Sequence, residues 1–150
     1  MSEKDRAVEL FKEGFNCSQS VFTAFAYRFG MDEETALKVS AGLGGGLGRM
    51  REVCGAVSGG AMVIGSICSA TEGKDGYSKQ KNYELVREFA EKFAKENGSI
   101  ICRELLELDV KMEESAKPEE RTAQYYKKRP CVELVECAAR IIEEMIKENE

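Results

Sequence analysis

Residues 42–68 read GLGGGLGRMREVCGAVSGGAMVIGSIC, and this stretch decides the fold. Its first part is a run of glycines, which predicts an extended flexible loop. Its second part belongs to an uncharged segment, residues 53–71, and we expect a buried helix from Cys54 to about Ala70. Small residues recur there four apart, so they share one side of that helix and let neighbouring backbones come close. The pairs are Gly55 with Gly59, Ala56 with Gly60, and Ala61 with Gly65.

The uncharged segment is nearly long enough to cross a bilayer, which takes about 20 apolar residues. However, it contains four glycines and three serines, and it lacks a sustained run of Leu, Ile or Phe. No aromatic belt flanks it. We therefore interpret it as a helix buried in protein and expect no membrane partner.

Helical periodicity extends from this segment in both directions. Towards the N-terminus, apolar residues predict two short helices separated at Gly14 and Asn16, then a third from an Asp32 cap to about Ser40, ended by Gly42. Towards the C-terminus we expect helices at residues 78–97, at 99–108 with Ser99 as its cap, and at 131–147 after Pro130. No segment alternates with period two. The sequence predicts an all-α, compact single-domain bundle of about six to seven helices over residues 1–150.

The composition excludes several function classes. The 150 residues suit one domain, and the absence of histidine rules out Ser-His-Asp and Cys-His catalytic pairs and histidine-ligated haem. The formal charge of −5, with Lys and Arg spread among acidic residues, gives no general attraction to nucleic acid. The N-terminal residues mix both signs of charge without an apolar signal core. We therefore expect a cytoplasmic protein, in which thiols stay reduced.

Six cysteines in so short a chain indicate where the chemistry lies. Four of them, Cys17, Cys54, Cys102 and Cys131, fall in the first turn of a predicted helix. Unpaired amides and the positive end of the helix dipole stabilise a thiolate there and lower its pKa. Because thiolates react and bind metals, these four are the candidate catalytic and metal-ligating residues. The other two, Cys68 and Cys137, lie inside predicted helices, and we interpret them as packed thiols.

The spacing of the cysteines leaves the kind of centre open. No Cys-x-x-Cys occurs, so zinc-ribbon, thioredoxin-type and ferredoxin-type motifs are absent. Four thiolates brought together by folding can still ligate an iron–sulfur cluster or a zinc ion. The glycine loop matches no dinucleotide or phosphate-binding pattern; it is either a plain connector or a source of amides that surround an anion or a cluster sulfide. The candidate cofactor-binding residues are Gly45, Gly46, Gly48, Arg49 and Gly55.

Five motifs occur in a fixed order along the chain. They are Asn16-Cys17-Ser18-Gln19, the glycine loop ending in Gly48-Arg49, Cys54-Gly55-Ala56-Val57-Ser58-Gly59, Cys102-Arg103-Glu104-Leu105 and Arg129-Pro130-Cys131. As a set they resemble the C_GCAxxG_C_C family of redox-active proteins. The resemblance maps the family's cysteines onto the same four that the helix starts select. It implies a redox role, it implies an iron–sulfur centre through related domains in multi-domain cytochromes, and it implies no substrate.

Three functions follow as hypotheses. The favoured one is an iron–sulfur cluster held by the four cysteines, which passes electrons to a redox partner protein. The second is a thiol–disulfide oxidoreductase in which two of the four cycle, without a metal cofactor. The third is a structural zinc site or a packing role in a binding module. In addition, the small-residue face of the central helix predicts burial against a second copy of the chain, as a homodimer.

Overall fold

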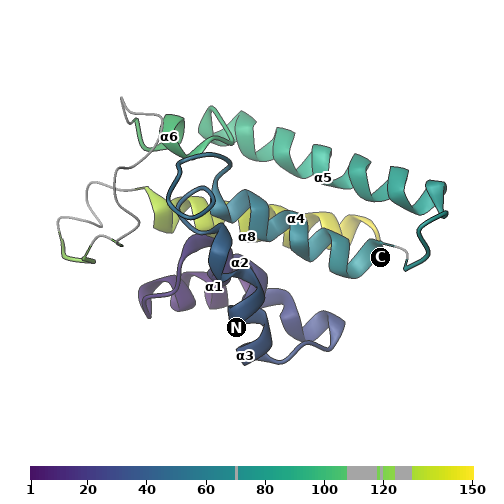
Figure 1. Ribbon diagram of the computed structural model, residues 1–150, viewed down its shortest axis with the longest axis horizontal. Helices are drawn as coiled ribbons and strands as arrows, with labels where there is room; N and C mark the ends of the chain where they lie inside the picture. Colours follow the sequence, from purple (N-terminus) through teal and green to yellow (C-terminus); the bar gives the residue numbers. More distant parts are fainter. Residues whose placement is uncertain (70, 108–117, 119, 124–129) are drawn as a thin grey trace.

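The computed structural model describes residues 1–69, 71–107, 118, 120–123 and 130–150. This part of the chain is all-α, as predicted, and carries no strand beyond an isolated antiparallel bridge between Val53 and Ile101 (Figure 1). The α-helices are α1 (Glu3–Lys12), α2 (Cys17–Phe25), α3 (Glu33–Ser40), α4 (Gly55–Cys68), α5 (Gly76–Asn97), α6 (Cys102–Leu105) and α8 (Cys131–Glu148). The 3-10 turns are η1 (Ala26–Phe29) and η2 (Ala41–Leu43).

Side-chain caps set several helix starts where the sequence predicts them. The Asn16 side chain accepts a hydrogen bond from the Gln19 N–H at 2.9 Å, and the Gln19 side chain accepts one from the Asn16 N–H at 3.0 Å. This reciprocal capping box makes Cys17 the first residue of α2. The Asp32 side chain caps α3 by accepting a hydrogen bond from the Thr35 N–H, without a reciprocal bond. At the other end of α5, Gly98 adopts the left-handed conformation that stops the helix.

Helix α3 ends at Ser40, as predicted, with Ala41 rather than Gly42 as its C-cap. Two predicted boundaries are wrong. Helix α5 begins at Gly76, capped by Asp75, rather than at Ser78. Helix α6 spans only Cys102–Leu105. The Ser99 hydroxyl accepts from the Ile101 N–H instead of capping a helix, because residues 100–102 pair with residues 52–54. The last residue of the predicted helix, 108, lies outside the described residues, as does the expected end of α4 at residue 70.

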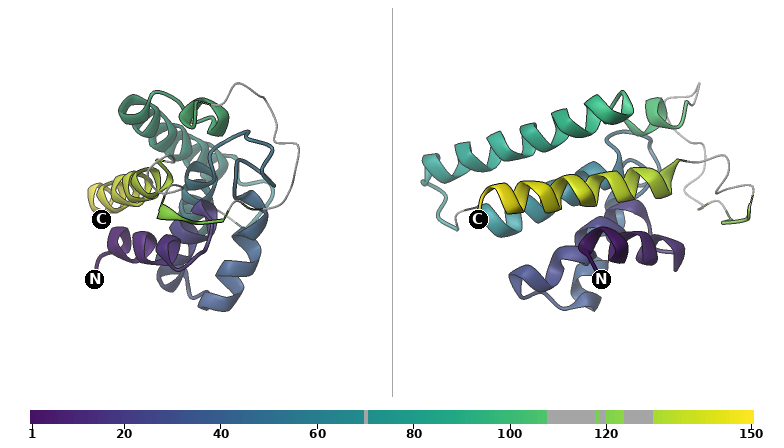
Figure 2. Two further views of the ribbon diagram at one scale, coloured as in Figure 1. Left: turned by 90° about the vertical axis from the view of Figure 1, so that its left-hand side faces the viewer. Right: turned by 180° about the vertical axis from the view of Figure 1, so that it is seen from behind.

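The helices form two groups. Helices α4, α5 and α8 run side by side along the long axis, and α1 and α2 pack below them, α1 against α8 and α2 against α4 (Figures 1 and 2). The largest buried side chains lie between these groups and within them. They include Phe11, Phe22, Phe25, Phe89, Phe93, Ile141 and Ile142. The resulting core holds the starts of α2, α4 and α8 at a common end of the molecule.

The uncharged helix α4 is buried in protein, as predicted. A Cβ at Gly59 would lie 2.8 Å from the Ser18 carbonyl oxygen of α2, and one at Gly60 would lie 2.4 Å from the Phe89 ring of α5. The glycines therefore admit close neighbours on two sides of the helix. Across the described ranges, none of the helices has both the length and the apolar character of a membrane span.

Candidate redox site at the helix starts

The glycine loop is a tight left-handed turn, so the prediction of an extended loop is wrong. Five consecutive residues, 45–49, have φ between 55° and 70°, and Leu47 and Arg49 share this conformation with the glycines. The turn closes through hydrogen bonds from the Gly48 N–H to the Gly42 carbonyl at 2.9 Å and from the Glu52 N–H to the Gly46 carbonyl at 2.9 Å. These bonds fold the loop over the start of α2 and lead directly into Cys54.

All four cysteines from predicted helix starts line one pocket of about 70 Å³. Cys17 opens α2, Cys54 immediately precedes α4, Cys102 opens α6 and Cys131 opens α8. The end of the molecule where α6, the glycine loop and the start of α8 meet is visible in Figure 1. All six cysteines of the chain are thiols rather than disulfides.

Cys17 and Cys54 form a hydrogen-bonded pair. The Cys54 thiol donates to the Cys17 sulfur, and this bond is the main cause that lowers the pKa of Cys17 to about 6. Burial opposes the shift, while the backbone N–H groups of Gly45, Ser18 and Cys17 itself add to it. The pKa of Cys54 is raised well above its ordinary value by the same neighbour and by burial. These opposite shifts favour one shared proton for the pair, with Cys17 the more acidic of the two thiols.

The absence of side chains at Gly55 and Gly46 leaves space for the Cys17 sulfur and the Cys102 side chain. A Cβ on Gly55 would lie 2.5 Å from the Cys17 Sγ, and one on Gly46 would lie 2.7 Å from the Cys102 Cβ. Gly45 contributes its N–H to Cys17. Of the other predicted cofactor-binding residues, Gly48 faces open space, and Arg49 packs on Gly45 without lining the pocket in the described part.

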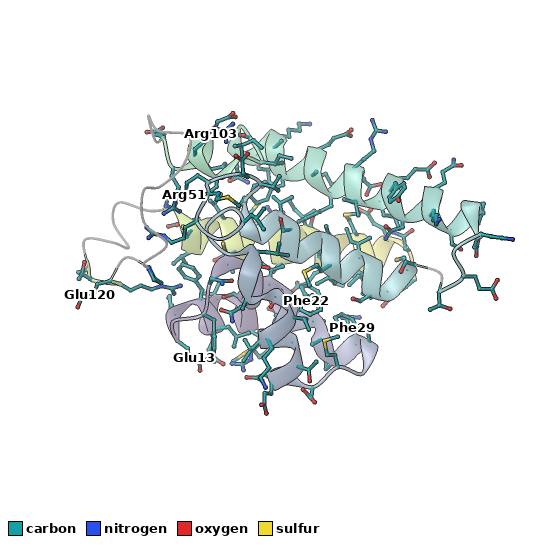
Figure 3. The ribbon with its side chains drawn as sticks, in the orientation of Figure 1. Glu13, Phe22, Phe29, Arg51, Arg103 and Glu120 are labelled. Carbon is teal, nitrogen blue, oxygen red and sulfur yellow. The ribbon has the colours of Figure 1, made fainter. Side chains whose placement is uncertain are left out.

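Arg51 is a site residue that the sequence pattern does not identify as one. Its side chain is buried, lines the pocket, and donates from Nη1 to the Cys102 Sγ at 3.6 Å. Figure 3 labels Arg51 at the end of the molecule where the glycine loop lies. In the sequence, this arginine lies three residues before Cys54. The chain reversal at the Val53–Ile101 bridge brings Cys102 to it instead.

Arg121 also lines the pocket, from a segment that carries no sequence signal of its own. Its guanidinium lies 4.0 Å from the centre of the Phe11 ring and donates to the Phe15 carbonyl at 2.7 Å. Among the described residues that line the pocket there are two arginines and neither Asp nor Glu. The walls thus favour negative charge on the sulfurs.

The thiols do not form a ready metal site. Within the ranges that the structure describes, no group of three or more Cys, Asp or Glu side chains is arranged to hold a metal ion. The iron–sulfur and zinc predictions thus gain no direct support from the geometry. The basic residues 127–129 that precede Cys131 lie outside the described residues.

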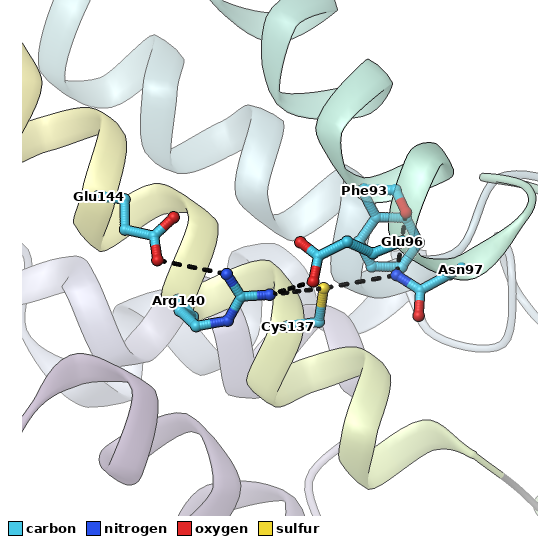
Figure 4. A network of polar contacts seen from close by, with 6 residues as sticks. All are labelled: Phe93, Glu96, Asn97, Cys137, Arg140 and Glu144. Carbon is cyan, nitrogen blue, oxygen red and sulfur yellow. Dashed lines mark hydrogen bonds and ion pairs between the residues drawn. The ribbon is translucent and has the colours of Figure 1, made fainter.

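The two remaining cysteines do not line this pocket. Cys137 is partly buried in α8 and accepts hydrogen bonds from the Asn97 amide at 3.4 Å and the Arg140 guanidinium at 3.6 Å (Figure 4). Burial raises its pKa. Cys68, predicted to be packed, is exposed because α4 ends there. It borders an apolar groove of about 470 Å³ between α4, α5 and α8, and partial burial raises its pKa as well.

Fold and site together define a small all-α protein with four cysteines around one pocket. A family model described as "Putative redox-active protein (C_GCAxxG_C_C)" matches residues 15–145, and the chain belongs to this family. The match covers all four pocket cysteines and confirms the resemblance drawn from the motifs. Comparison with curated proteins and with solved structures gives no match.

Proposed function

We propose that the protein is a dithiol–disulfide redox protein whose working pair is Cys17 and Cys54. The observation that carries this proposal is the hydrogen bond between the two sulfurs at the starts of α2 and α4. One partner is held as a thiolate and the other as its proton donor. This is the arrangement of an attacking thiol and a resolving thiol.

The redox cycle exchanges two electrons and two protons. In the oxidising direction, the Cys17 thiolate attacks a sulfur of an external disulfide, an S–S bond forms to Cys17, and one external thiolate leaves. Cys54 then loses its proton and attacks the Cys17 sulfur, which releases the second external thiolate. The external disulfide is reduced to two thiols, and Cys17 and Cys54 are oxidised to a disulfide. An external dithiol reverses these steps.

The residues around the pair support each role. N–H groups of Gly45 and Ser18 hold the negative charge on Cys17, and the absence of a side chain at Gly55 lets the two helix starts approach. Arg51 holds Cys102 on the wall of the same pocket. We assign Cys102 and Cys131, which line the same pocket, to the redox site as further thiols.

The test is an equilibrium titration of the full chain in buffers of reduced and oxidised dithiothreitol, followed by alkylation and peptide mass mapping. We expect one two-electron transition that forms the Cys17–Cys54 disulfide. The Cys17→Ser and Cys54→Ser variants lose this transition, whereas Cys68→Ser, which alters an exposed thiol away from the pocket, retains it. A wild-type chain in which both sulfurs stay alkylatable at every ratio contradicts the proposal.

An iron–sulfur cluster is the second candidate, because four cysteines line a single pocket. Cys17, Cys54, Cys102 and Cys131 would supply its thiolate ligands, and the cluster would supply one-electron transfer. In the described residues the thiols are not arranged as a ligand set, so the sulfurs would have to move towards one another. Iron analysis of protein purified without air tests this candidate. About two or more irons per chain would support the cluster, and one zinc per chain would support a structural role.

The proposal includes a cytoplasmic location and a protein redox partner, both as predicted from the sequence. The open side of the pocket, where Cys17 is partly exposed, is the place for such a partner. The homodimer also stays a prediction. The small-residue face of α4 gives it little support, since Gly59 and Gly60 already contact α2, α5 and α8 of the same chain. Light scattering measures the mass directly.

A further inference from the structure

The pocket beside Cys17 is small and open on one side. Its volume of about 70 Å³ corresponds to roughly two water molecules at the volume each occupies in the liquid. Hydrogen peroxide or a short alkyl hydroperoxide fits this volume. A hydroperoxide with a bulky substituent places only its peroxide oxygens in this volume and keeps the substituent outside.

The lining of the pocket suits a reaction that expels a negatively charged oxygen. Arg51 and Arg121 contribute two guanidinium groups, and the described lining contains no carboxylate. The Gly45 N–H points to the Cys17 sulfur from the glycine turn. When a thiolate attacks a hydroperoxide, the leaving hydroxide or alkoxide gains negative charge, which guanidinium groups on the pocket wall stabilise. The Gly45 N–H instead holds the sulfur in its thiolate form before the attack.

We propose that the protein reduces small hydroperoxides, with Cys17 as the attacking sulfur and Cys54 as the resolving thiol. This inference rests on the dithiol centre proposed above and names its oxidant. The supporting geometry is a pocket of peroxide size that Cys17 and Cys54 both line, with two arginines on its walls and the Cys17 sulfur packed against Gly55, the residue after Cys54.

The steps balance in atoms and electrons. Cys17 Sγ attacks one peroxide oxygen; an S–O bond forms, the O–O bond breaks, and the leaving oxygen takes a proton to become water or an alcohol. Cys17 is then a sulfenic acid. Cys54 loses its proton and attacks the Cys17 sulfur; an S–S bond forms, the S–O bond breaks, and hydroxide leaves as water. The peroxide gains two electrons, and an external dithiol later returns two electrons to the disulfide.

The experiment mixes the reduced full chain with hydrogen peroxide at pH 7 in the absence of oxygen. In wild type, peptide mapping follows the Cys17–Cys54 disulfide over time. In Cys54→Ser, dimedone traps the sulfenic acid on Cys17. Cys68, in the same chain, is the internal reference, because it is an exposed thiol outside the pocket. We expect oxidation of Cys17 to exceed that of Cys68 by more than about tenfold, since one well-placed donor contributes about 100-fold or more.

Cumene hydroperoxide provides the control for pocket size. We expect it to oxidise Cys17 more slowly than hydrogen peroxide does, while Cys68 shows no such preference. Oxidation of Cys17 within about tenfold of Cys68 overturns the inference. If the disulfide forms with oxidised dithiothreitol but not with peroxide, only this inference fails. If it forms with neither oxidant, the proposed dithiol function fails as well.

Discussion

Cys17 and Cys54 have the same side chain but opposite pKa shifts, because the hydrogen bond between them is the main cause of both shifts. At pH 7 a thiol with a pKa of about 6 is about nine-tenths ionised, against a few per cent for an ordinary thiol of pKa about 8.5. However, the intrinsic nucleophilicity of a thiolate falls with its pKa, which lowers the reactivity of each Cys17 thiolate by roughly 10- to 18-fold. Ionisation alone makes Cys17 only about two- to threefold faster than an ordinary thiol. Any larger rate comes from the pocket.

The ionisation of Cys17 gives the first prediction. We expect its alkylation by iodoacetamide to follow a pH profile with a midpoint near 6. The Cys54→Ala variant removes the S–H donor and shifts the midpoint upward, towards the ordinary thiol pKa, whereas Cys68→Ser leaves it unchanged. Mass spectrometry of the Cys17 peptide measures the rates. A midpoint near 8.5 in wild type would contradict the hydrogen-bonded pair.

The same shift predicts the pH dependence of stability. The folded pKa of Cys17 lies below its unfolded value, so its contribution is fully present above the unfolded pKa and is lost as pH falls through about 6. Between these limits, wild type should gain unfolding free energy relative to Cys17→Ser as pH rises. Urea unfolding of both proteins across this range checks the sign. A difference that is independent of pH would contradict it.

At the residue scale, the sequence identifies the four pocket cysteines but not their partners. Helix-start position is a local property, and the Asn16 cap and Pro130 reveal it. The pairing of Cys17 with Cys54, and of Arg51 with Cys102, depends on contacts between distant segments. The sequence contains no alternating strand pattern that would have predicted the Val53–Ile101 bridge behind the second pairing.

Among the elements, α4 depends most on the absence of side chains. A methyl group at Gly60 would lie 2.4 Å from the Phe89 ring and 2.9 Å from the Ile142 Cδ1. We expect Gly60→Ala to lower the unfolding free energy by about 1–3 kcal/mol. Gly65→Ala in the same helix meets only the Asn82 amide at 3.8 Å and should raise it by up to about 1 kcal/mol. Denaturant titration measures both; equal effects would contradict the close packing.

In α4, replacing Gly60 by alanine is expected to lower the stability. In the glycine turn, replacing Leu47 by glycine is expected to preserve or raise it. Leu47 is exposed and has a φ of 70°, which costs an ordinary residue about 1–2 kcal/mol. Leu47→Gly relieves this cost and adds about 0.4–1 kcal/mol of unfolded-state entropy. We expect the stability to stay equal or rise by up to about 1 kcal/mol. In contrast, Leu47→Val should destabilise the fold. A large loss in Leu47→Gly, seen by thermal melting, would show that the side chain is needed for packing.

At the element scale, helix existence is predictable and loop shape is not. Periodic apolar residues and side-chain caps specify α2, α3, α5 and α8 to within a few residues. The glycine run indicates only that the backbone can adopt many conformations. Its left-handed conformation follows from hydrogen bonds between residues 42–46 and 47–52 and from contacts with Cys102, which no local pattern encodes.

On the scale of the whole molecule, the proposed disulfide would join α2 to α4, two helices that pack against each other in the core. It would close a loop of roughly 37 residues, which restricts the unfolded chain and stabilises the folded one by about 3–4 kcal/mol. For a chain of this size, we expect the oxidised protein to melt about 10 °C higher than the reduced protein. Calorimetry of both forms measures this. A lower melting temperature after oxidation would indicate that the disulfide distorts the pocket.

The all-α bundle follows from the sequence because each helix buries its own periodic face. The location of the site is a property of the whole chain, since the starts of α2, α4, α6 and α8 meet at one end only after the helices pack (Figure 1). Family membership then connects this end to redox chemistry.

The decisive measurement for the Cys17–Cys54 pair is peptide mass mapping of the full chain after equilibration with excess oxidised dithiothreitol. We expect a disulfide between the peptides that carry Cys17 and Cys54, with Cys68 and Cys137 still alkylatable. A fully oxidised sample in which Cys17 and Cys54 both remain free thiols would contradict it.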